Sequence, residues 1–229
     1  MNSSSQERVL LLVGSAKRPR STSESLGTYL CERLGERGFE AGTLLLHRAL
    51  KSDQGREDLL AAADRADVLV IAFPLYVDSL PYLVIRAMER IARHRQARGE
   101  GKSHRLVAIV NCGFPEAHQN DTALATCRQF AREAGFEWAG GLALGGGEAI
   151  SGQPLPKVKG MARNVIKSLD LTATALAEGK PVPQEAVESM AKPITPAWIY
   201  ALLGGMGWKR QARKYGAQKR LRDRPYHQS

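Results

Sequence analysis

The hydrophobic pattern of residues 1–150 alternates between two kinds of segment. Continuous apolar runs, which are typical of strands buried on both faces of a sheet, predict five strands. They lie at residues 9–13, 39–46, 67–73, 105–111 and 137–144. Between these runs, apolar residues recur every three or four positions, as Leu26, Leu30 and Leu34 do, and this spacing predicts amphipathic helices.

Polar residues and a proline indicate where three of the helices begin. Asp53 is expected to cap a short helix, and Asn120 or Asp121 is expected to cap a longer one. Pro81 falls in the first turn of a third helix, where its missing N–H costs no hydrogen bond. Strands and helices therefore follow one another in regular order.

Strands that alternate with helices form a parallel sheet with right-handed crossovers. Five such units within about 150 residues match the flavodoxin-like, doubly wound sheet with strand order 2-1-3-4-5, whereas the dinucleotide-binding fold has six strands. Ligands of such sheets bind beyond the carboxyl ends of the strands. We therefore expect an α/β protein whose functional loops follow Val13, Phe73 and Val110.

The remainder of the chain has a different pattern. One long helix is expected over residues 156–178, where it would close the sheet, and a short one over 184–191. An apolar patch then precedes a basic tail, and it contains Trp198, Ile199, Leu202, Leu203 and Trp208. We therefore divide the chain into a domain at 1–180 and a helical, basic extension at 181–229.

The apolar patch between Trp198 and Trp208 permits two interpretations. It is too short to span a bilayer, which takes about 20 apolar residues. Tryptophans beside lysines also occur in segments that lie in the membrane interface. We favour packing of the patch on the parent domain or across a dimer, and a membrane-surface contact of the basic tail is the alternative.

The formal net charge of +10 is distributed unevenly over the 229 residues. Residues 192–229 hold nine Lys and Arg and a single acid, Asp223, so the body of the protein is nearly neutral. Such a tail suits nucleic acid, an anionic membrane or an acidic partner, or it is a solvated helix face, which is the interpretation that we favour. No zinc finger or aromatic platform accompanies it, so we expect no nucleic acid as partner.

The N-terminus and the cysteines indicate a compartment. The first residues, MNSSSQER, lack the apolar stretch of a secretory signal. Cys31, Cys112 and Cys127 are odd in number and lack C-x-x-C spacing, which argues against a disulfide framework, an iron–sulfur cluster and a structural zinc site. We expect a reduced, cytoplasmic protein without a metal site.

A loop rich in hydroxyl and basic residues follows the first strand, where the chain reads GSAKRPRSTSES from Gly14. A strand, a polar loop and a helix N-terminus together make an anion site. The loop lacks the glycines of the P-loop and of the G-x-G-x-x-G fingerprint. Side-chain hydroxyls suit the terminal phosphate of a mononucleotide such as FMN, and the alternative is an ordinary turn with a Ser or Thr cap.

The loop after the third strand, PLYVDSLP at residues 74–81, could hold the flavin ring. An isoalloxazine needs apolar surface against its face and backbone donors at its polar edge. Leu75, Tyr76 and Val77 could supply the surface, and the N–H groups of Tyr76, Val77 and Asp78 the donors. Alternatively, Tyr76 is a half-buried strand-end aromatic, and Asp78 or Ser79 caps a helix.

The loop after the fourth strand, NCGFPE at residues 111–116, lies at the matching position. Asn111, Cys112 and Phe114 could line the ring, and Gly113 would allow a close backbone approach. Alternatively, Cys112 is a small buried apolar residue, since no histidine lies beside it to activate the thiol.

These loops resemble those of the flavodoxin-like NAD(P)H-dependent FMN reductases and related quinone or aromatic-substrate reductases. In that family a strand is followed by a hydroxyl-rich phosphate loop, here GSAKRPRSTS, and the third strand by a P-x-Y-x-x-x-[LM]-P flavin loop, here PLYVDSLP. The resemblance covers roughly residues 8–150. Two departures are Pro19, which stiffens the phosphate loop, and the absence of the cysteine cluster of the iron–sulfur branch, so that FMN alone is implied.

The resemblance implies which residues bind the cofactor. For the phosphate they are Ser15, Lys17, Ser21, Thr22 and Ser23; for the ring they are Pro74, Leu75, Tyr76, Val77 and Asp78, with Asn111, Cys112 and Gly113 from the more variable third loop.

The resemblance also implies the reaction. NAD(P)H would pass a hydride to flavin N5 and leave, and a quinone-like, aromatic or free-flavin acceptor would take the electrons at the same face, with no catalytic side chain required. A homodimer is expected. The alternatives are a flavodoxin-like electron carrier that does not oxidise NAD(P)H itself, and a flavin-free binding module that uses the basic tail.

Overall fold

The computed structural model describes residues 6–17, 20–99, 104–194 and 209–223. The chain divides into two units, residues 1–194 and residues 195–229. The apolar patch between Trp198 and Trp208 lies outside the described residues, as does Pro19 of the phosphate loop. None of the described helices is long and apolar enough to cross a membrane.

The first unit is built on a five-stranded parallel sheet with the order β2-β1-β3-β4-β5. The strands are β1 (Arg8–Val13), β2 (Glu40–Leu45), β3 (Val68–Pro74), β4 (His104–Asn111) and β5 (Phe136–Leu144). Every residue of β4 is buried, as expected for a strand covered on both faces. The α/β class and the strand order expected from the sequence are both confirmed.

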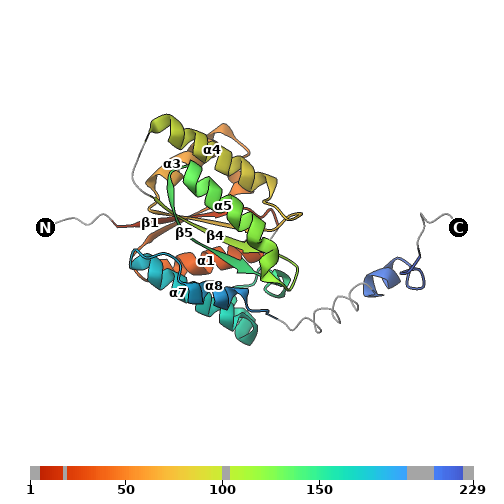
Figure 1. Ribbon diagram of the computed structural model, residues 1–229. Helices are drawn as coiled ribbons and strands as arrows, with labels where there is room; N and C mark the ends of the chain where they lie inside the picture. The colour runs from red at the N-terminus through yellow and green to blue at the C-terminus, as the bar shows by residue number, and fades with distance from the viewer. Residues whose placement is uncertain (1–5, 18–19, 100–103, 195–208, 224–229) are drawn as a thin grey trace. The chain divides into compact units, whose positions relative to one another are not determined.

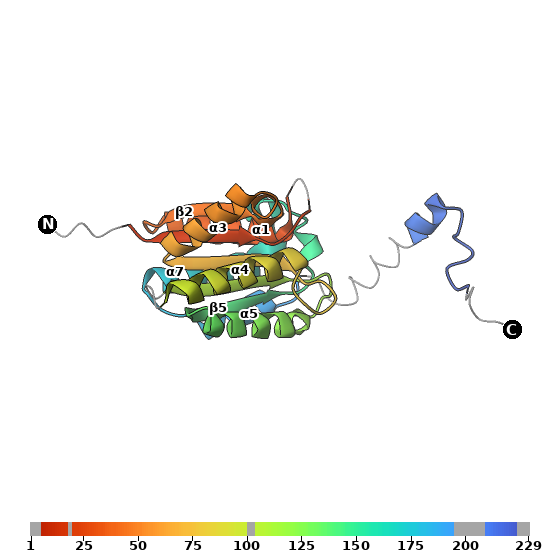
Figure 2. The same ribbon diagram turned by 90° about the horizontal axis from the view of Figure 1, so that it is seen from above.

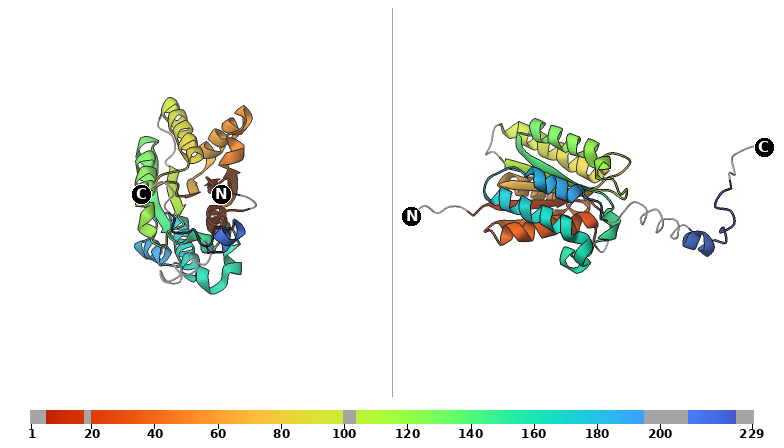
Figure 3. Two further views of the ribbon diagram at one scale, coloured as in Figure 1. Left: turned by 90° about the vertical axis from the view of Figure 1, so that its right-hand side faces the viewer. Right: turned by 60° about the horizontal axis from the view of Figure 1, so that its bottom comes forward.

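Helices cover both faces of this sheet (Figure 1). One face carries α1 (Thr22–Gly35), α7 (Arg163–Ala177) and α8 (Gln184–Ala191), and the other carries α3 (Asp53–Arg65), α4 (Tyr82–Arg98) and α5 (Asp121–Glu133), with the short α2 (Leu46–Ala49) beside them. The end-on view in Figure 3 shows the sheet between the two helical layers. Each layer has its own apolar core against the sheet.

Alternate residues of a strand enter opposite cores. In β1, Leu11 packs with the core on the α1 side, whereas Leu10 and Leu12 pack with the core on the α4 side. This alternation follows from the period of two residues along a strand. Figure 2 shows α3, α4 and α5 side by side across one face of the sheet.

The register of the sheet brings three strand ends together. Val13 at the end of β1 pairs with Ala72 of β3, and Pro74 at the end of β3 pairs with Asn111 at the end of β4. Since all three strands are parallel, the loops that follow them leave the sheet at the same edge. The loops expected to be functional therefore lie next to one another.

Two expectations for the chain after residue 150 differ from the structure. The single helix expected over 156–178 is divided into α6 (Leu155–Val158), the 3-10 segment η3 (Lys159–Ala162) and α7. Gly160, a poor helix former, lies in the 3-10 segment. A 3-10 turn between the two α-helices interrupts the regular helical geometry.

Residues 181–194, which we assigned to the C-terminal extension, are grouped by the structure with the sheet domain. The Val182 N–H donates to the carbonyl of Ala139 in β5 at 2.7 Å. The Ser168 hydroxyl of α7 donates to the carbonyl of Ala186 in α8 at 2.6 Å. These contacts, together with the buried side chain of Met190, join α8 to the domain core.

Candidate functional site

A cleft of about 220 Å³ opens at the carboxyl ends of β1, β3 and β4. Its lining contains eleven of the thirteen residues expected to bind a cofactor, and one further residue, Glu148. The lining residues are Ser15, Lys17, Ser21, Thr22, Ser23, Pro74, Leu75, Tyr76, Asn111, Cys112, Gly113 and Glu148. Val77 and Asp78 are the two expected residues that do not line it.

The polar end of the cleft begins where β1 ends at Gly14. The Gly14 N–H donates to the Ala72 carbonyl at 2.8 Å. A Cβ at Gly14 would lie 2.2 Å from a methyl carbon of Val84 and 2.8 Å from Cβ of Phe73, so only glycine fits here. The close packing of the strand end on α4 thus fixes where the polar loop starts.

Helix α1 begins beside this loop with a side-chain cap. The Ser21 hydroxyl accepts a hydrogen bond from the Glu24 N–H at 3.1 Å, so Ser21 is the N-cap that its residue type predicts. The first-turn N–H groups of a helix have no intrahelical partner, and the helix dipole adds partial positive charge there. The start of α1, where Ser21, Thr22 and Ser23 line the cleft, is therefore suited to bind an anion.

The next two hydroxyls are already engaged with other loops. The Ser23 hydroxyl donates to Oδ1 of Asn111 at 2.7 Å, and the Thr22 hydroxyl donates to the Gly147 carbonyl at 2.8 Å. Ser23, Thr22 and Asn111 are all buried. These two bonds connect the start of α1 to the end of β4 and to the loop after β5.

Other donors face the cleft. Ser15 accepts a hydrogen bond from the Lys17 N–H at 3.3 Å, and Ser21 accepts one from Glu24, so each hydroxyl still has its own proton to donate. Lys17 is exposed at the cleft and adds a full positive charge. Two hydroxyls, an ammonium group and first-turn N–H groups together suit a phosphate monoester.

The loop after β3 forms a tight turn at the other end of the cleft. The Tyr76 N–H donates to the Ser79 carbonyl at 2.9 Å, and the Ser79 N–H donates to the Tyr76 carbonyl at 3.0 Å. Between them, Val77 and Asp78 have φ values of 49° and 55°, in the left-handed region. That region is costly for a β-branched residue such as valine.

This turn departs from two expectations. The Tyr76 N–H, expected to donate to a ring, donates within the turn instead. The alternative role of Asp78 as a helix cap is not realised, since the residue at the cap position of α4 is Pro81, without a side-chain cap bond. Val77 is 97% exposed at the tip of the turn, outside the cleft.

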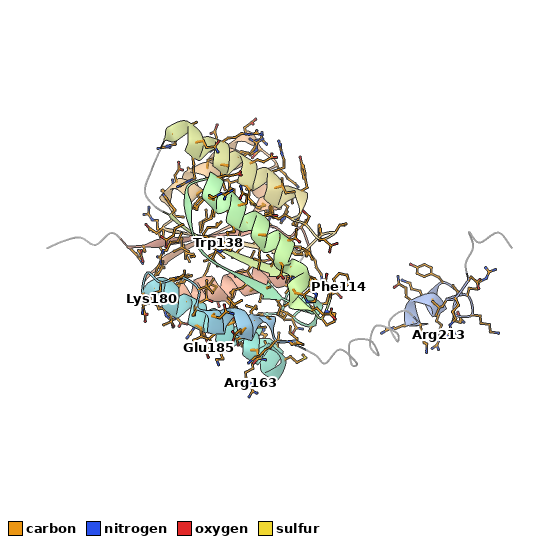
Figure 4. The ribbon with its side chains drawn as sticks, viewed as in Figure 1. Phe114, Trp138, Arg163, Lys180, Glu185 and Arg213 are labelled. Carbon is orange, nitrogen blue, oxygen red and sulfur yellow. The ribbon has the colours of Figure 1, made fainter. Side chains whose placement is uncertain are left out.

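The aromatic side chain of Tyr76 lines this end of the cleft, whereas Phe114, which was expected to line the ring, is not part of the lining. Tyr76 and Phe114 are each 54% exposed, so about half of each side chain is accessible to solvent, and for Tyr76 this also fits the alternative of a half-buried strand-end aromatic. Phe114 projects from the loop end of the domain (Figure 4). Leu75 is partly buried, and its N–H donates to the Asn111 carbonyl at 2.8 Å. This end of the cleft offers an apolar surface.

The thiol of Cys112 lines the cleft but is only 4% exposed. Its sulfur lies 3.4 Å from the Phe114 carbonyl and 3.5 Å from Nδ2 of Asn120. Burial raises the pKa of the Cys112 thiol above its ordinary value, and the hydrogen bond from Asn120 opposes this effect only in part. Cys112 is therefore a protonated, small apolar residue at neutral pH, as in the alternative interpretation.

The glycine-rich loop after β5 is a part of the site that the sequence did not assign. A Cβ at Gly145 would lie 2.2 Å from the Pro115 carbonyl oxygen, and one at Gly152, whose φ is 74°, would lie 2.3 Å from the Arg20 carbonyl oxygen. The glycines therefore let this loop pack directly on the phosphate loop and on the loop after β4. Glu148 enters the cleft lining from the same loop, and the run GGGE was its only sequence signal.

Among the described residues, no group of three His, Cys, Asp or Glu side chains is placed to hold a metal ion.

Comparison with known proteins indicates the same fold. The sequence model of the Flavodoxin_2 family, described as flavodoxin-like fold, matches residues 7–163. No curated protein matches the chain in sequence.

Several solved structures are similar to this one. One is an FMN-dependent NADH-azoreductase from Bacillus anthracis str. Ames Ancestor in complex with FMN, at 15% identity and TM-score 0.53 over 75% of this chain and 100% of that chain. A second is the apo form of an NADH:FMN oxidoreductase, EMOB, at 15% identity and TM-score 0.53 over 83% of this chain and 96% of that chain. A third is RosB with a bound intermediate, 8-demethyl-8-formylriboflavin-5'-phosphate, at 12% identity and TM-score 0.56 over 97% of this chain and 91% of that chain. At these identities the similarity concerns the fold.

Proposed function

The chain belongs to the Flavodoxin_2 family, which has the flavodoxin-like fold, and from this premise we propose that it is an FMN-dependent oxidoreductase that takes a hydride from NAD(P)H. The observation that carries the proposal is the cleft itself. Three loops that are far apart in the sequence meet there, with anion-binding groups at one end and apolar side chains at the other.

This division suits a mononucleotide whose phosphate and aromatic ring need different surroundings. At the polar end, the hydroxyls of Ser15 and Ser21, the ammonium group of Lys17 and the first N–H groups of α1 hold the phosphate. A hydroxyl that accepts from the backbone and donates to a phosphate oxygen is fully satisfied in both roles. The donor set therefore fits the phosphate of FMN.

At the apolar end, Leu75, Tyr76 and Gly113 line the cleft, and they would hold the flavin ring. FMN, when bound, supplies the hydride and electron chemistry. The chain binds and orients the flavin and leaves its reactive side accessible from the open cleft. No side chain is assigned as a proton donor or acceptor, in keeping with a reaction that the cofactor performs.

The similar structures named above support the proposal through their bound or named ligands. One is titled as an azoreductase in complex with FMN, one as an NADH:FMN oxidoreductase, and one contains a flavin derivative. The acceptor of this protein is proposed to be a quinone-like, aromatic or free-flavin molecule. NADH and NADPH are both retained as electron donors.

We further propose that the protein acts as a homodimer. Tyr82 and Ile85 of α4 are 71% and 39% exposed beside the exposed turn after β3, and Tyr76 stands at the cleft rim. Such exposed apolar side chains are typical of interaction surfaces. Sedimentation of the protein with Tyr82→Glu should show a shift from dimer to monomer.

The test of the main proposal begins with the colour of the purified protein. We expect bound FMN, identified by chromatography after release by heat, and bleaching of the flavin absorbance when NADH or NADPH is added without oxygen. Flavin that binds but is not bleached by either nucleotide would indicate an electron carrier. A folded protein that FMN neither stabilises nor saturates would contradict both.

A pair of variants tests the assignment of the phosphate end. Lys17→Gln removes the ammonium group at the cleft, and Lys51→Gln removes one on an exposed segment outside it. A charge-assisted hydrogen bond contributes about 1.5–3 kcal/mol, so FMN affinity should fall by one to two orders of magnitude in the first variant alone. Equal affinities for FMN in the two variants would contradict the assignment.

A further inference from the structure

The second unit of the chain has a strongly basic surface. Residues 209–223 contain seven Lys and Arg and one acid, Asp223, and residues 209–214 form a short helix. All seven basic side chains are exposed: Lys209, Arg210, Arg213, Lys214, Lys219, Arg220 and Arg222. The charge is therefore presented to solvent and available to a partner.

This charge is not balanced within the unit. The ion pair found among the described residues of the unit joins Arg220 to Asp223 at 3.4 Å. Residues 195–229 carry eight Lys and Arg and one acid, so that +7 of the net +10 of the protein lies in this last part of the sequence. Like charges at this density repel one another, and an anionic partner that binds the surface reduces this repulsion.

Apolar side chains accompany the basic ones. Arg210, Arg213, Lys214 and Tyr215 line one open hollow, and Tyr215 is 71% exposed. Figure 4 labels Arg213 on this helix. Leu221 is also exposed, at 49%. A surface with cations, an aromatic ring and an aliphatic side chain matches the boundary between lipid headgroups and acyl chains.

The second unit also contains an uncharged segment directly before the basic one. Residues 195–208, TPAWIYALLGGMGW, contain no charged side chain and include Trp198, Tyr200 and Trp208. These residues lie outside the described part of the chain. An uncharged segment with tryptophans, directly followed by a polybasic one, is the composition of segments that bind at the membrane interface.

We propose that residues 209–223 dock the protein on the surface of an anionic lipid bilayer. Single-stranded nucleic acid fits less well, since base stacking requires several interleaved aromatic rings and the described tail carries only Tyr215. Docking on a bilayer takes the place of the solvated helix face that the charge pattern favoured. It goes beyond the proposed oxidoreductase function and does not depend on it.

The test uses the full chain and vesicles of phosphatidylcholine, with and without phosphatidylglycerol. We expect the protein to float with the anionic vesicles and not with the neutral ones, and binding to weaken as salt is raised. Each basic residue near an anionic surface contributes about fivefold in affinity. The combined change Arg210→Gln, Arg213→Gln, Lys214→Gln and Lys219→Gln should therefore weaken binding by about two to three orders of magnitude.

A matched control removes the same charge from the first unit. Lys51, Arg93, Arg128 and Arg132 are exposed on that unit and outside the cleft. Their combined change to glutamine should alter vesicle binding by less than about threefold, because these charges lie outside the basic surface. Circular dichroism and FMN binding should be unchanged in both combined variants, which separates this test from that of the oxidoreductase proposal.

Three results would overturn the proposal. The first is that the intact protein fails to bind anionic vesicles at low salt. The second is that the control variant loses as much binding as the tail variant. The third is that an RNA or DNA duplex of equal phosphate concentration binds the protein more tightly than the vesicles do. Loss of FMN binding or of NAD(P)H oxidation would bear on the proposed function alone.

Discussion

At the α1 end of the cleft, buried hydroxyls are bonded across loops, whereas at the end formed by the turn after β3 the side chains face solvent. Thr22 and Ser23 are buried, and both donate to residues more than 80 positions away in the sequence. Tyr76 and Val77 are 54% and 97% exposed, and the bonds of their turn are local. Hydrogen bonds to distant segments therefore hold the conformation of the α1 end, whereas hydrogen bonds within the turn hold that of the other end.

The difference matches what each end has to bind. A phosphate carries charge, and fixed dipoles stabilise charge best when they need no rearrangement. An aromatic ring requires an apolar surface of adequate area, which tolerates movement. The left-handed residues Val77 and Asp78 show that the second end tolerates unfavourable backbone conformations. Preformed order is therefore concentrated at the phosphate end.

The largest effect is expected where the glycine-rich loop packs on the phosphate loop. Gly152→Ala would place a Cβ 2.3 Å from the Arg20 carbonyl oxygen at a φ of 74°. Overpacking and a left-handed alanine should together reduce the free energy of unfolding by about 2–5 kcal/mol, measured with a chemical denaturant. Gly160→Ala is the matched control, because a Cβ there meets nothing within 4 Å. Equal stability of the two variants would show that the packing of the loops does not stabilise the domain.

The second-largest loss of stability is expected when the hydrogen bond between Ser23 of α1 and Asn111 of β4 is removed. Ser23→Ala leaves Oδ1 of Asn111 buried without its donor, which should cost about 1–3 kcal/mol. FMN affinity should fall with it, because Asn111 also lines the cleft. Ser79→Ala at the exposed turn is the control and should change stability by less than about 0.5 kcal/mol. Equal losses of stability in Ser23→Ala and Ser79→Ala would contradict the difference between the two ends of the cleft.

At the ring end of the cleft, we expect substitutions that increase the free energy of unfolding. Val77→Asn and Asp78→Gly together place the residues preferred in a two-residue turn with positive φ at both positions. The double variant should gain about 0.5–2 kcal/mol in unfolding free energy, measured by thermal unfolding. FMN affinity should change less than it does in Ser23→Ala, since neither Val77 nor Asp78 lines the cleft. A loss of stability would indicate that the turn has another conformation in solution.

The smallest expected effect concerns the rate at which the cysteine thiols are alkylated. Only a thiolate reacts with iodoacetamide, and burial raises the pKa of Cys112, so its alkylation should be slow at pH 7 and should accelerate as the pH rises above about 9. Bound FMN should slow it further. Burial raises the pKa values of Cys31 and Cys127 to about 12, so these two should stay unmodified throughout. Rapid labelling of Cys112 at pH 7 would contradict the burial of its thiol.

Much of the fold follows from local pattern. Hydrophobic periodicity predicted the five strands and the helices between them, because a strand buried on both faces requires a continuous apolar run. The interruption at Gly160 was missed, since one glycine within an apolar pattern does not by itself end a helix. The grouping of α8 with the domain was missed for a different reason. The contact of Val182 with β5 joins segments that no local pattern connects.

The sequence by itself determined the order of the elements and the residue types at three strand ends, since both depend on periodicity and on the chemistry of individual side chains. Only the tertiary structure decided how those residues are used. In the folded domain, the hydroxyls of Thr22 and Ser23 donate hydrogen bonds to segments that are distant in the sequence, and a glycine-rich loop places Glu148 in the cleft lining. A hydroxyl has several alternative partners, and which of them it meets depends on distances between segments that are distant along the chain.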